Sequence, residues 1–261
     1  MSRILVTSDW HCGHLRGITP PDWQWENKSE TAWRKKVCAY QKWAWAELMS
    51  YVDEFRPYTH HINLGDCVDG KGQLSGGREH LTVDREEQQK MAIATFKAIR
   101  VNKKKTYMVR GTGYHVGISE EWENGIATAV KAEIDDHMYI EINGVVISAK
   151  HFVGGCQSPV SKATSIVKEQ LTNDQWQREY KEHPRASIFL RGHVHRTIAV
   201  DEPSTLSMIV PGLQWWTGFG AKKCSMPVHF GIVAIDIDKK GNWSWQRRTA
   251  NLGQQVRCIK G

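Results

Sequence analysis

Short apolar runs that end in polar or small residues recur along the first three quarters of the chain. These runs cover residues 4–7, 61–64, 106–109, 145–149 and 188–190, and an Asp, Gly or His stands within two residues of the end of each. Runs of this length and composition are typical of buried β-strands. Side chains able to do chemistry are therefore predicted to lie just past the ends of strands.

Between these runs, apolar residues recur with the three- or four-residue spacing of helices that cover a sheet. The predicted helices span residues 33–55, 84–100, 119–132 and 159–180. Ser29 is the predicted N-cap of the first helix, and Pro57 ends it because proline cannot continue a helix. Ser158 followed by Pro159 predicts the start of the last helix, since serine caps a helix and proline suits its first turn.

The last third of the chain has a different pattern. Residues 197–200, 206–210, 232–237 and 243–248 alternate in polarity as strands do, and residues 239–242 form a predicted hairpin turn. An α/β first part followed by these strands predicts a second sheet. No internal repeat, low-complexity tract or linker interrupts the sequence, so residues 1–261 are expected to form a single domain.

The composition is that of a globular chain without a membrane segment. Of the 261 residues, 40% are hydrophobic and 24% are charged, which excludes a disordered chain. No stretch approaches the roughly 20 apolar residues that span a bilayer, so no membrane association is expected. The six cysteines include no C-x-x-C pair, and reduced thiols in a cytoplasmic protein are the simplest interpretation.

Charge and aromatic content bear on the partner. A net charge of +7 would attract polyanions such as nucleic acid, although each short basic cluster can equally be a solvated face. The 12 tryptophans include pairs at Trp215/Trp216 and Trp243/Trp245. Exposed pairs would offer stacking platforms for bases, whereas core packing is the commoner fate of tryptophan.

Two motifs at predicted strand ends contain metal-binding side chains. Asp9 and His11 follow the first run, and an oxygen and an imidazole nitrogen two positions apart suit Mn, Fe or Zn. Asp66 and Asp69 lie in a G-D-x-x-D sequence directly after the second run. The glycine allows a tight turn, and the aspartate after it can use both oxygens to bridge two cations, although an aspartate-rich surface turn has the same pattern.

A third motif places two histidines after a strand. His193 and His195 follow Gly192 at the end of residues 188–190. On a straight strand their side chains would point to opposite faces, so both reach one site only if the backbone bends, which Gly192 permits. A lone histidine is more often structural than a ligand. Two in this arrangement, on a chain that also carries the other motifs, predict metal binding.

Taken in order, these motifs resemble those of the calcineurin-like metallophosphoesterase superfamily, whose pattern is D-x-H, G-D-x-x-D, G-N-H-[DE], a separate histidine and G-H-x-H. The resemblance extends from Asp9 to His195. It implies a four-layer α-β-β-α sandwich of two mixed sheets flanked by helices. It also implies hydrolysis of phosphate esters by in-line attack of a hydroxide that bridges two divalent metal ions. Manganese is the favoured metal, and iron, zinc or nickel would also fit.

The resemblance further implies roles for individual residues. The implied ligands are Asp9, His11 and His195 for one ion, His151 and His193 for the other, and Asp66 as the bridge between them. His151 takes the place of the separate histidine because it follows residues 145–149, and His137 is the alternative.

The chain departs from the family pattern at residues 110–115. Where the family has adjacent Gly-Asn-His, this sequence has Gly111-Thr112, and His115 comes two residues late. Thr112 or a water would then replace the asparagine that binds the second metal. The G-T-x-x-H form, together with the preceding G-D-x-x-D-G-K-G, resembles phosphoesterases encoded by bacteriophages.

His115 is the predicted general acid, because histidine titrates near neutral pH and can lend a proton to a leaving group. Asp69 matches the family residue that orients this histidine, although a side chain that stabilises the loop fits the pattern nearly as well. Arg110 is a candidate phosphate clamp, and a surface position is the alternative. The other histidines occupy no motif position and are predicted to be structural or surface groups: His14, His60, His61, His80, His183 and His229.

The expected substrate is a phosphodiester or phosphomonoester of a nucleotide or nucleic acid, which suits the basic charge and the aromatic residues. The fold does not choose among nucleases, nucleotidases and protein phosphatases. The altered segment at Thr112 leaves open a catalytically weakened scaffold of the same fold. A nucleic-acid-binding module with structural metals is a second alternative, and the sequence predicts no oligomeric state.

Overall fold

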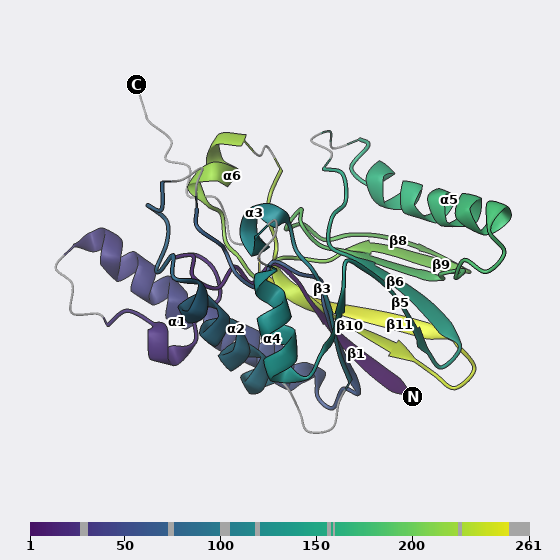
Figure 1. Ribbon diagram of the computed structural model, residues 1–261, viewed down its shortest axis with the longest axis horizontal. Helices are drawn as coiled ribbons and strands as arrows, with labels where there is room; N and C mark the ends of the chain where they lie inside the picture. Colours follow the sequence, from purple (N-terminus) through teal and green to yellow (C-terminus); the bar gives the residue numbers. More distant parts are fainter. Residues whose placement is uncertain are drawn as a thin grey trace.

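The computed structural model describes residues 1–26, 31–72, 76–99, 105–117, 121–155, 158, 160–223 and 226–250. Its strands form a six-stranded and a five-stranded sheet, with helices on the outer side of each (Figure 1). Both sheets are mixed, because each contains parallel and antiparallel neighbours.

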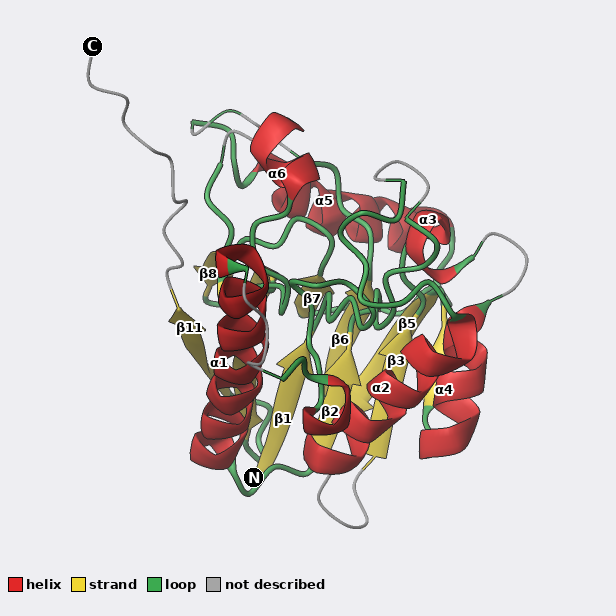
Figure 2. Ribbon diagram, turned by 90° about the vertical axis from the view of Figure 1, so that its left-hand side faces the viewer, coloured by secondary structure: helices red, strands yellow, loops and turns green. Residues whose placement is uncertain are grey.

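The first sheet has the strand order β11-β10-β1-β2-β3-β4. Its strands are β1 (Ser2–Thr7), β2 (His60–Asn63), β3 (Lys105–Val109), β4 (Glu133–Asp135), β10 (Phe230–Ile237) and β11 (Trp243–Ala250). Strands β1 to β4 run parallel, because helical crossovers return the chain between them. These crossovers contain α1 (Ala32–Phe55), α2 (Arg85–Ile99) and α4 (Trp122–Val130), which cover one face of the sheet (Figure 2).

The second sheet has the strand order β5-β6-β7-β9-β8. Its strands are β5 (His137–Ile142), β6 (Val145–Lys150), β7 (Ile188–Arg191), β8 (Ile198–Glu202) and β9 (Thr205–Ile209). Strands β6, β7 and β9 are parallel, and β5 and β8 pair antiparallel at the two edges. Helix α5 (Thr164–Glu179) lies along the outer side of this sheet (Figure 1).

Apolar side chains fill the space between the two sheets and the space under the helices. Val6 and Ile62 of the first sheet share one fully buried cluster with Ile147 and Leu190 of the second. A separate cluster packs α1, α2 and α4 against the other face of the first sheet, with Phe55 among its buried members. The predicted four-layer sandwich of two mixed sheets is therefore confirmed.

The prediction that the last strands form a second sheet is wrong for the final hairpin. Strand β10 pairs antiparallel with β1, and β11 continues the first sheet beyond it. Every residue from Phe230 to Ile237 is buried, as expected for a strand covered on both faces. The second sheet instead begins with β5. Alternation along a strand reports burial but does not identify the neighbouring strand.

Helix starts also differ from prediction. Thr31 is the N-cap of α1, and its side chain accepts a hydrogen bond from Arg34 N, whereas Ser29 lies outside the described residues. Helix α5 begins at Thr164, well after Ser158, and Pro159 is outside the described residues. Three short helices were not predicted: η1 (Pro21–Trp23), α3 (Gly113–Val116) and α6 (Gly218–Lys223).

The remaining composition-based predictions have mixed outcomes. Within the described part of the chain, no helix has the length and apolar character needed to cross a membrane. Cys12, Cys38 and Cys67 are free and buried, and the other cysteines lie outside the described residues. Trp215 packs against Tyr40 with ring centroids 4.9 Å apart, and both Trp243 and Trp245 pack against the core between the sheets. These three tryptophans therefore follow the core-packing interpretation.

His61 on β2 is a buried histidine that should make stability depend on pH. Its Nε2 lies 2.9 Å from Thr7 Oγ1, and its ring is nearly parallel to that of Trp10 and tilted against that of Phe96. Burial lowers the pKa of His61 to about 3, so the folded chain holds this imidazole neutral. An unfolded histidine titrates near about 6.5. Between these values only the unfolded chain binds the proton, so stability falls as the pH drops through this window.

We expect His61 to lower the free energy of unfolding by up to about 2 kcal/mol between about pH 7 and about pH 5. Urea unfolding at the two pH values, in a chelating buffer, measures this change. His61→Asn removes the titration while keeping a polar partner for Thr7, so its pH dependence should be weaker by that amount. An identical pH dependence in both proteins would contradict the assignment.

Candidate metal centre

The predicted ligands all follow the carboxyl ends of strands that meet at one edge of the two sheets. Asp9 and His11 follow β1, Asp66 follows β2, Thr112 follows β3, His151 follows β6, and His193 and His195 follow β7. Parallel strands of one sheet end at a common edge, and the packing of the two sheets brings the two sets together. The result is a cluster of carboxylates and imidazoles.

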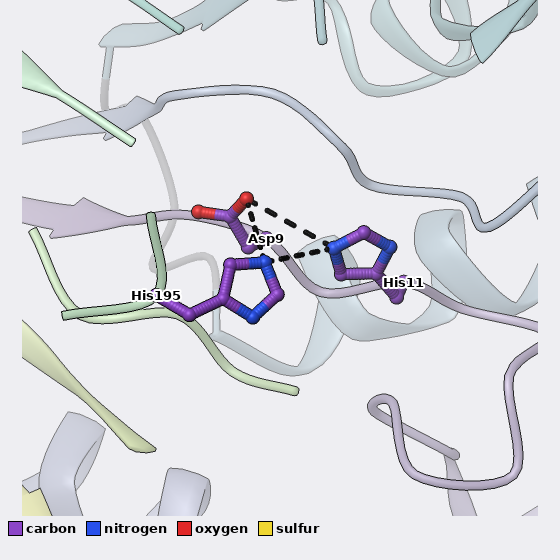
Figure 3. Close-up of side chains that lie close together, drawn as sticks. All are labelled: Asp9, His11 and His195. Carbon is purple, nitrogen blue, oxygen red and sulfur yellow. Dashed lines mark hydrogen bonds and ion pairs between the residues drawn. The ribbon is translucent and has the colours of Figure 1, made fainter. Parts of the chain in front are cut away.

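The first group consists of Asp9, His11 and His195, each of which offers one ligand atom within 4.8 Å of the others. His195 Nε2 lies 3.1 Å from Asp9 Oδ1 and 3.2 Å from His11 Nε2 (Figure 3). The gap between His11 Nε2 and Asp9 Oδ1 is 3.9 Å. These three atoms therefore point into one small space, as the motifs predicted for one metal ion.

The second group consists of Asp66, His151 and His193, again with ligand atoms within 4.8 Å of one another. His151 Nε2 lies 3.0 Å from Asp66 Oδ2, and the rings of His151 and His193 are in edge contact at 5.3 Å. Asp66 thus joins the two histidines predicted for the other ion. Its role as a bridge between both ions stays a prediction.

The backbone turns sharply at the ligands themselves. Asp9, His11, Asp66, His193 and His195 all have φ angles between 46° and 69°, in the left-handed region. Residues other than glycine rarely adopt this conformation, and it concentrates at functional sites, where it redirects a side chain at some cost in free energy. The two histidines of the third motif reach one site for this reason. The bend lies at His193 and His195 and not, as predicted, at Gly192.

Gly192 and Gly111 serve a different purpose, which is close approach. A Cβ atom at Gly192 would stand 2.2 Å from Ser8 Oγ, and one at Gly111 would stand 2.0 Å from Asp66 Oδ1. Neither neighbour leaves room for a side chain. These glycines therefore let the loops after β7 and β3 contact the aspartates after β1 and β2.

Hydrogen bonds orient three of the predicted ligands from behind. His151 Nδ1 contacts Leu64 O at 2.5 Å, and His11 Nδ1 contacts Asp69 Oδ1 at 2.9 Å, which turns both Nε2 atoms toward the cluster. Asp9 Oδ2 accepts from Ser8 Oγ at 2.5 Å and from His193 N at 3.1 Å, which leaves Oδ1 facing His195. Such outer contacts are what fixes imidazole and carboxylate ligands in metal sites.

The electrostatics favour charged carboxylates at neutral pH. Burial acts to raise the pKa of Asp9 and of Asp66, but His195 and His151 outweigh it and hold both pKa values well below their ordinary range. Burial lowers the pKa of His151, yet the charges of Asp66 and Asp9 more than offset this and raise it to about 10. A proton on His151 thus balances the carboxylates, and a cation that bound there would displace it.

The donor set fits divalent metal ions. Within the described residues, the buried atoms Asp9 Oδ1 and His151 Nε2 make no hydrogen bond of acceptable geometry. Leaving a buried polar atom unsatisfied costs about 1–3 kcal/mol, which a bound ion would relieve. Burial also lowers the pKa of His193 to about 4, so its imidazole is in the neutral, metal-binding form. Mixed carboxylate and imidazole ligands suit Mn, Fe and Zn.

Asp69 connects the cluster to the predicted general acid. His115 Nδ1 lies 2.9 Å from Asp69 O and 3.5 Å from Asp69 Oδ1. The same Oδ1 contacts His11, so His11, Asp69 and His115 form a third close group. Because Asp69 holds the outer nitrogen of His11, this group supports the first metal position and is not an additional one.

His80 was not predicted to take part, but the structure brings it to Asp69. Its side chain is buried, and its Nε2 lies 2.6 Å from Asp69 Oδ2. Its ring also contacts His14, with centroids 5.8 Å apart. His80 stands in a long loop without a motif or a strand next to it, so the sequence carries no signal for this contact.

Two of the predicted site residues, Thr112 and Arg110, form hydrogen bonds with other side chains. Thr112 donates from N to Asp66 Oδ1 at 2.8 Å, and its hydroxyl lies 3.3 Å from both Asp66 oxygens. Its role as a metal ligand stays a prediction. Arg110 Nε donates to Asn124 Oδ1 and Nη1 to Asp136 Oδ1, at 3.1 and 3.2 Å. These partners hold its guanidinium in this structure, and its role as a phosphate clamp stays a prediction.

Glu123 is a further residue that the sequence analysis missed. It is fully buried on α4 and accepts hydrogen bonds from Cys67 N and Gly111 N, both at 2.7 Å. These amides neighbour Asp66 and Thr112, so one carboxylate ties together the loops after β2 and β3. A signal was present, because Glu123 shares a helix face with the buried Ile126 and Val130. Burial and the charge of Asp66 raise its pKa to about 7.

Replacing Glu123 with glutamine should weaken metal binding by about 10- to 100-fold, the usual effect of losing an outer contact of a metal site. The amide can accept from one backbone N–H, but its NH₂ group opposes the other. Calorimetric titration with Mn²⁺ measures the affinity, and Glu141→Gln on the exposed part of β5 is the matched control. Unchanged affinity in Glu123→Gln would show that Glu123 does not position Asp66.

Comparison with known proteins finds similarity in structure only. No family model matches the chain, and no curated protein matches it. An archaeal phosphodiesterase has 12% identity and a TM-score of 0.45, with 95% of this chain and 99% of that chain covered. Vps29 from Entamoeba histolytica, solved with zinc, has 11% identity and a TM-score of 0.43, with 95% and 98% covered.

A conserved protein of Streptococcus pneumoniae, described as a predicted phosphoesterase, has 12% identity and a TM-score of 0.37, with 95% and 98% covered. These identities and TM-scores are low, so the fold of this chain rests on its own strand order and side-chain geometry. The two mixed sheets flanked by helices, with Asp and His residues gathered at the strand ends, form an α/β sandwich with a candidate metal centre.

Proposed function

We propose that this chain is a metal-dependent phosphoesterase of the calcineurin-like kind that binds two divalent ions. Asp9, His11 and His195 would hold one ion, and Asp66, His151 and His193 would hold the other. The observation that carries the proposal is the convergence of two separate carboxylate and histidine triads at one edge of the sandwich. A single structural metal needs only one such triad. When bound, a pair of divalent ions activates a water and neutralises charge on the phosphoryl oxygens.

The residues of the chain supply the remaining parts of the reaction. His115 lies beside His11, with ring centroids 4.5 Å apart, and its side chain is partly exposed. It can therefore meet a substrate that lies on the first triad and give a proton to the leaving oxygen. Asp69 holds His115 and His11 in fixed relation, so the acid keeps its position relative to the phosphorus.

Two exposed aromatic rings favour a substrate with bases on either side of the phosphorus. Phe152 is 53% exposed and contacts the ring of His193 at 4.9 Å. Tyr114 is 40% exposed and contacts the ring of His115 at 4.8 Å. The two rings therefore adjoin different ends of the centre. We propose a phosphodiester of nucleosides as the preferred substrate, with phosphomonoesters of nucleotides as the alternative within the same mechanism.

Hydrolysis of two p-nitrophenyl esters tests both the activity and the substrate. With Mn²⁺ added, the chain should cleave thymidine 5′-p-nitrophenyl phosphate faster than methyl p-nitrophenyl phosphate, and a chelator should abolish both reactions. Stacking on an aromatic ring contributes about 1–3 kcal/mol per base, so Phe152→Ala should lower kcat/KM about tenfold or more for the thymidine ester alone. Phe152→Tyr keeps the ring and should retain the rate.

The alternatives give different results in these assays. A non-catalytic scaffold would hydrolyse neither ester with any divalent ion. A nucleic-acid-binding module would bind DNA with strong salt dependence and leave the strands intact. Equal loss on both esters in Phe152→Ala would leave the phosphoesterase standing and reject the stacking role of Phe152.

A further inference from the structure

A pocket separate from the metal centre lies between α5 and the outer face of the second sheet. Its volume is about 350 Å³, within the range of about 300–1,000 Å³ in which small-molecule sites fall. Ile147 and Leu190 of β6 and β7 point into the core between the sheets, so the alternate residues Lys150 and Arg191 face α5 and line the pocket.

A row of basic side chains crosses three strands at one end of this pocket. His137 pairs with Lys150, and Lys150 pairs with Arg191, in the register of β5, β6 and β7. Cross-strand neighbours of this kind stand about 5 Å apart. Arg191 is 1% exposed and bonds to Glu169 at 2.7 Å and to Ser148 O at 2.9 Å. Its charge is therefore balanced by Glu169.

Lys150 supplies the unbalanced charge of the pocket. Among the described residues its ammonium has no ion pair and no side-chain hydrogen bond, although it lines the cavity. His137 contributes no charge near neutral pH, because burial, Arg191 and Lys150 together lower its pKa to about 4. With Arg191 and Glu169 cancelling, the pocket carries one net positive charge beside imidazole and hydroxyl groups. It is suited to one anionic group.

Aromatic side chains from α5 and the sheet also form a wall of the pocket. Trp176 of α5 is 50% exposed, and its ring lies nearly parallel to that of His183, with centroids 5.8 Å apart and planes at 26°. Tyr139 from β5 bonds His183 Nε2 through its hydroxyl at 3.0 Å, which fixes the wall. Phe189 lines the pocket on the sheet side and is buried. A flat ring can therefore pack on Trp176 while an anionic group reaches Lys150.

We propose that this pocket binds a small organic anion that carries a planar ring, the class represented by a nucleoside monophosphate. The role is binding rather than hydrolysis. Within the described part of the chain, no residue of the pocket belongs to a group of three side chains that could hold a metal ion. Lys150 directly precedes the ligand His151, and Arg191 stands two residues before His193. An occupant therefore contacts the same strand ends that present the second triad.

Calorimetric titration of the full chain with adenosine monophosphate, in a chelating buffer, tests the pocket without any contribution from bound metal. One molecule should bind per chain, and adenosine or inorganic phosphate alone should bind more weakly. Lys150→Met and Trp176→Leu should each weaken binding about tenfold or more, since one removes a charge-assisted contact and the other a stacked ring. Lys168→Met, on the exposed side of α5, should leave the affinity unchanged.

The proposal fails if adenosine monophosphate does not bind at about 1 mM. It also fails if Lys150→Met and Trp176→Leu bind it as tightly as the original chain, because the ligand would then sit elsewhere. Phosphate binding as tightly as the nucleotide would reject the aromatic part. Thermal unfolding of both variants confirms that they fold, and none of these results depends on hydrolysis at the metal centre.

Discussion

Replacing Asp66 with asparagine is expected to lower Mn-dependent hydrolysis of bis(p-nitrophenyl) phosphate about a thousandfold, since bound metals supply several kcal/mol of transition-state stabilisation. The exchange keeps the shape of the side chain and an oxygen that can accept from Thr112 N. It removes the negative charge beside His151, with which Asp66 Oδ2 is in contact at 3.0 Å. If Asp66 bridges the two positions, both ions should be lost together.

Metal content by plasma emission, measured on the same samples as the rate, separates the possible causes. Asp53→Asn on the surface of α1 is the matched control, since Asp53 pairs only with Arg56 among the described residues. An Asp66→Asn protein that kept full metal content and full rate would contradict the ligand role. Loss of one ion with the other retained would contradict the bridge alone.

Replacing His115 with glutamine should produce a defect that depends on the leaving group. A general acid contributes about 10²–10⁴-fold when the departing oxygen needs a proton. Nucleoside alkoxides need one, whereas p-nitrophenolate leaves readily without it. We therefore expect a loss of about a hundredfold or more for a dinucleotide, and a much smaller loss for bis(p-nitrophenyl) phosphate. Both rates are measured at the same Mn²⁺ concentration.

The control for this experiment is His60→Gln on β2. Among the described residues, His60 belongs to none of the three groups of side chains that could hold a metal ion. An equal loss on both substrates in His115→Gln would mean that His115 supports the metal position through Asp69 and does not protonate the leaving group. Metal affinity, determined in parallel, should be nearly unchanged if His115 acts as the acid.

The sequence predicted where the candidate site lies better than it predicted the contacts that hold the site residues in place. Asp9, His11, Asp66, His193 and His195 were predictable because each follows an apolar strand, and strand ends meet at an edge whatever the loops do. Their left-handed backbone was not predictable from residue type, since aspartate and histidine adopt it only where surrounding contacts impose it. The structure therefore showed a bend at the histidines where the glycine had been expected to provide it.

The missed residues share a physical reason. His80 meets Asp69 through a loop contact between residues far from any motif, which no local pattern records. Glu123 did leave a trace, as a carboxylate on the buried face of α4, but the two amides it binds come from other elements. The pairing of β10 with β1 is likewise a non-local choice. Local pattern identified strands and ligands, whereas their partners depended on the assembled sandwich.

The most direct test of the metal centre is a crystal structure of the chain grown with Mn²⁺ and measured near the manganese absorption edge. We expect two anomalous peaks, one among Asp9, His11 and His195 and the other among Asp66, His151 and His193. Two-metal sites place their ions about 3.5–4 Å apart, and the peaks should show that separation. A single peak, or peaks away from these six side chains, would contradict a two-metal centre at this edge of the sandwich.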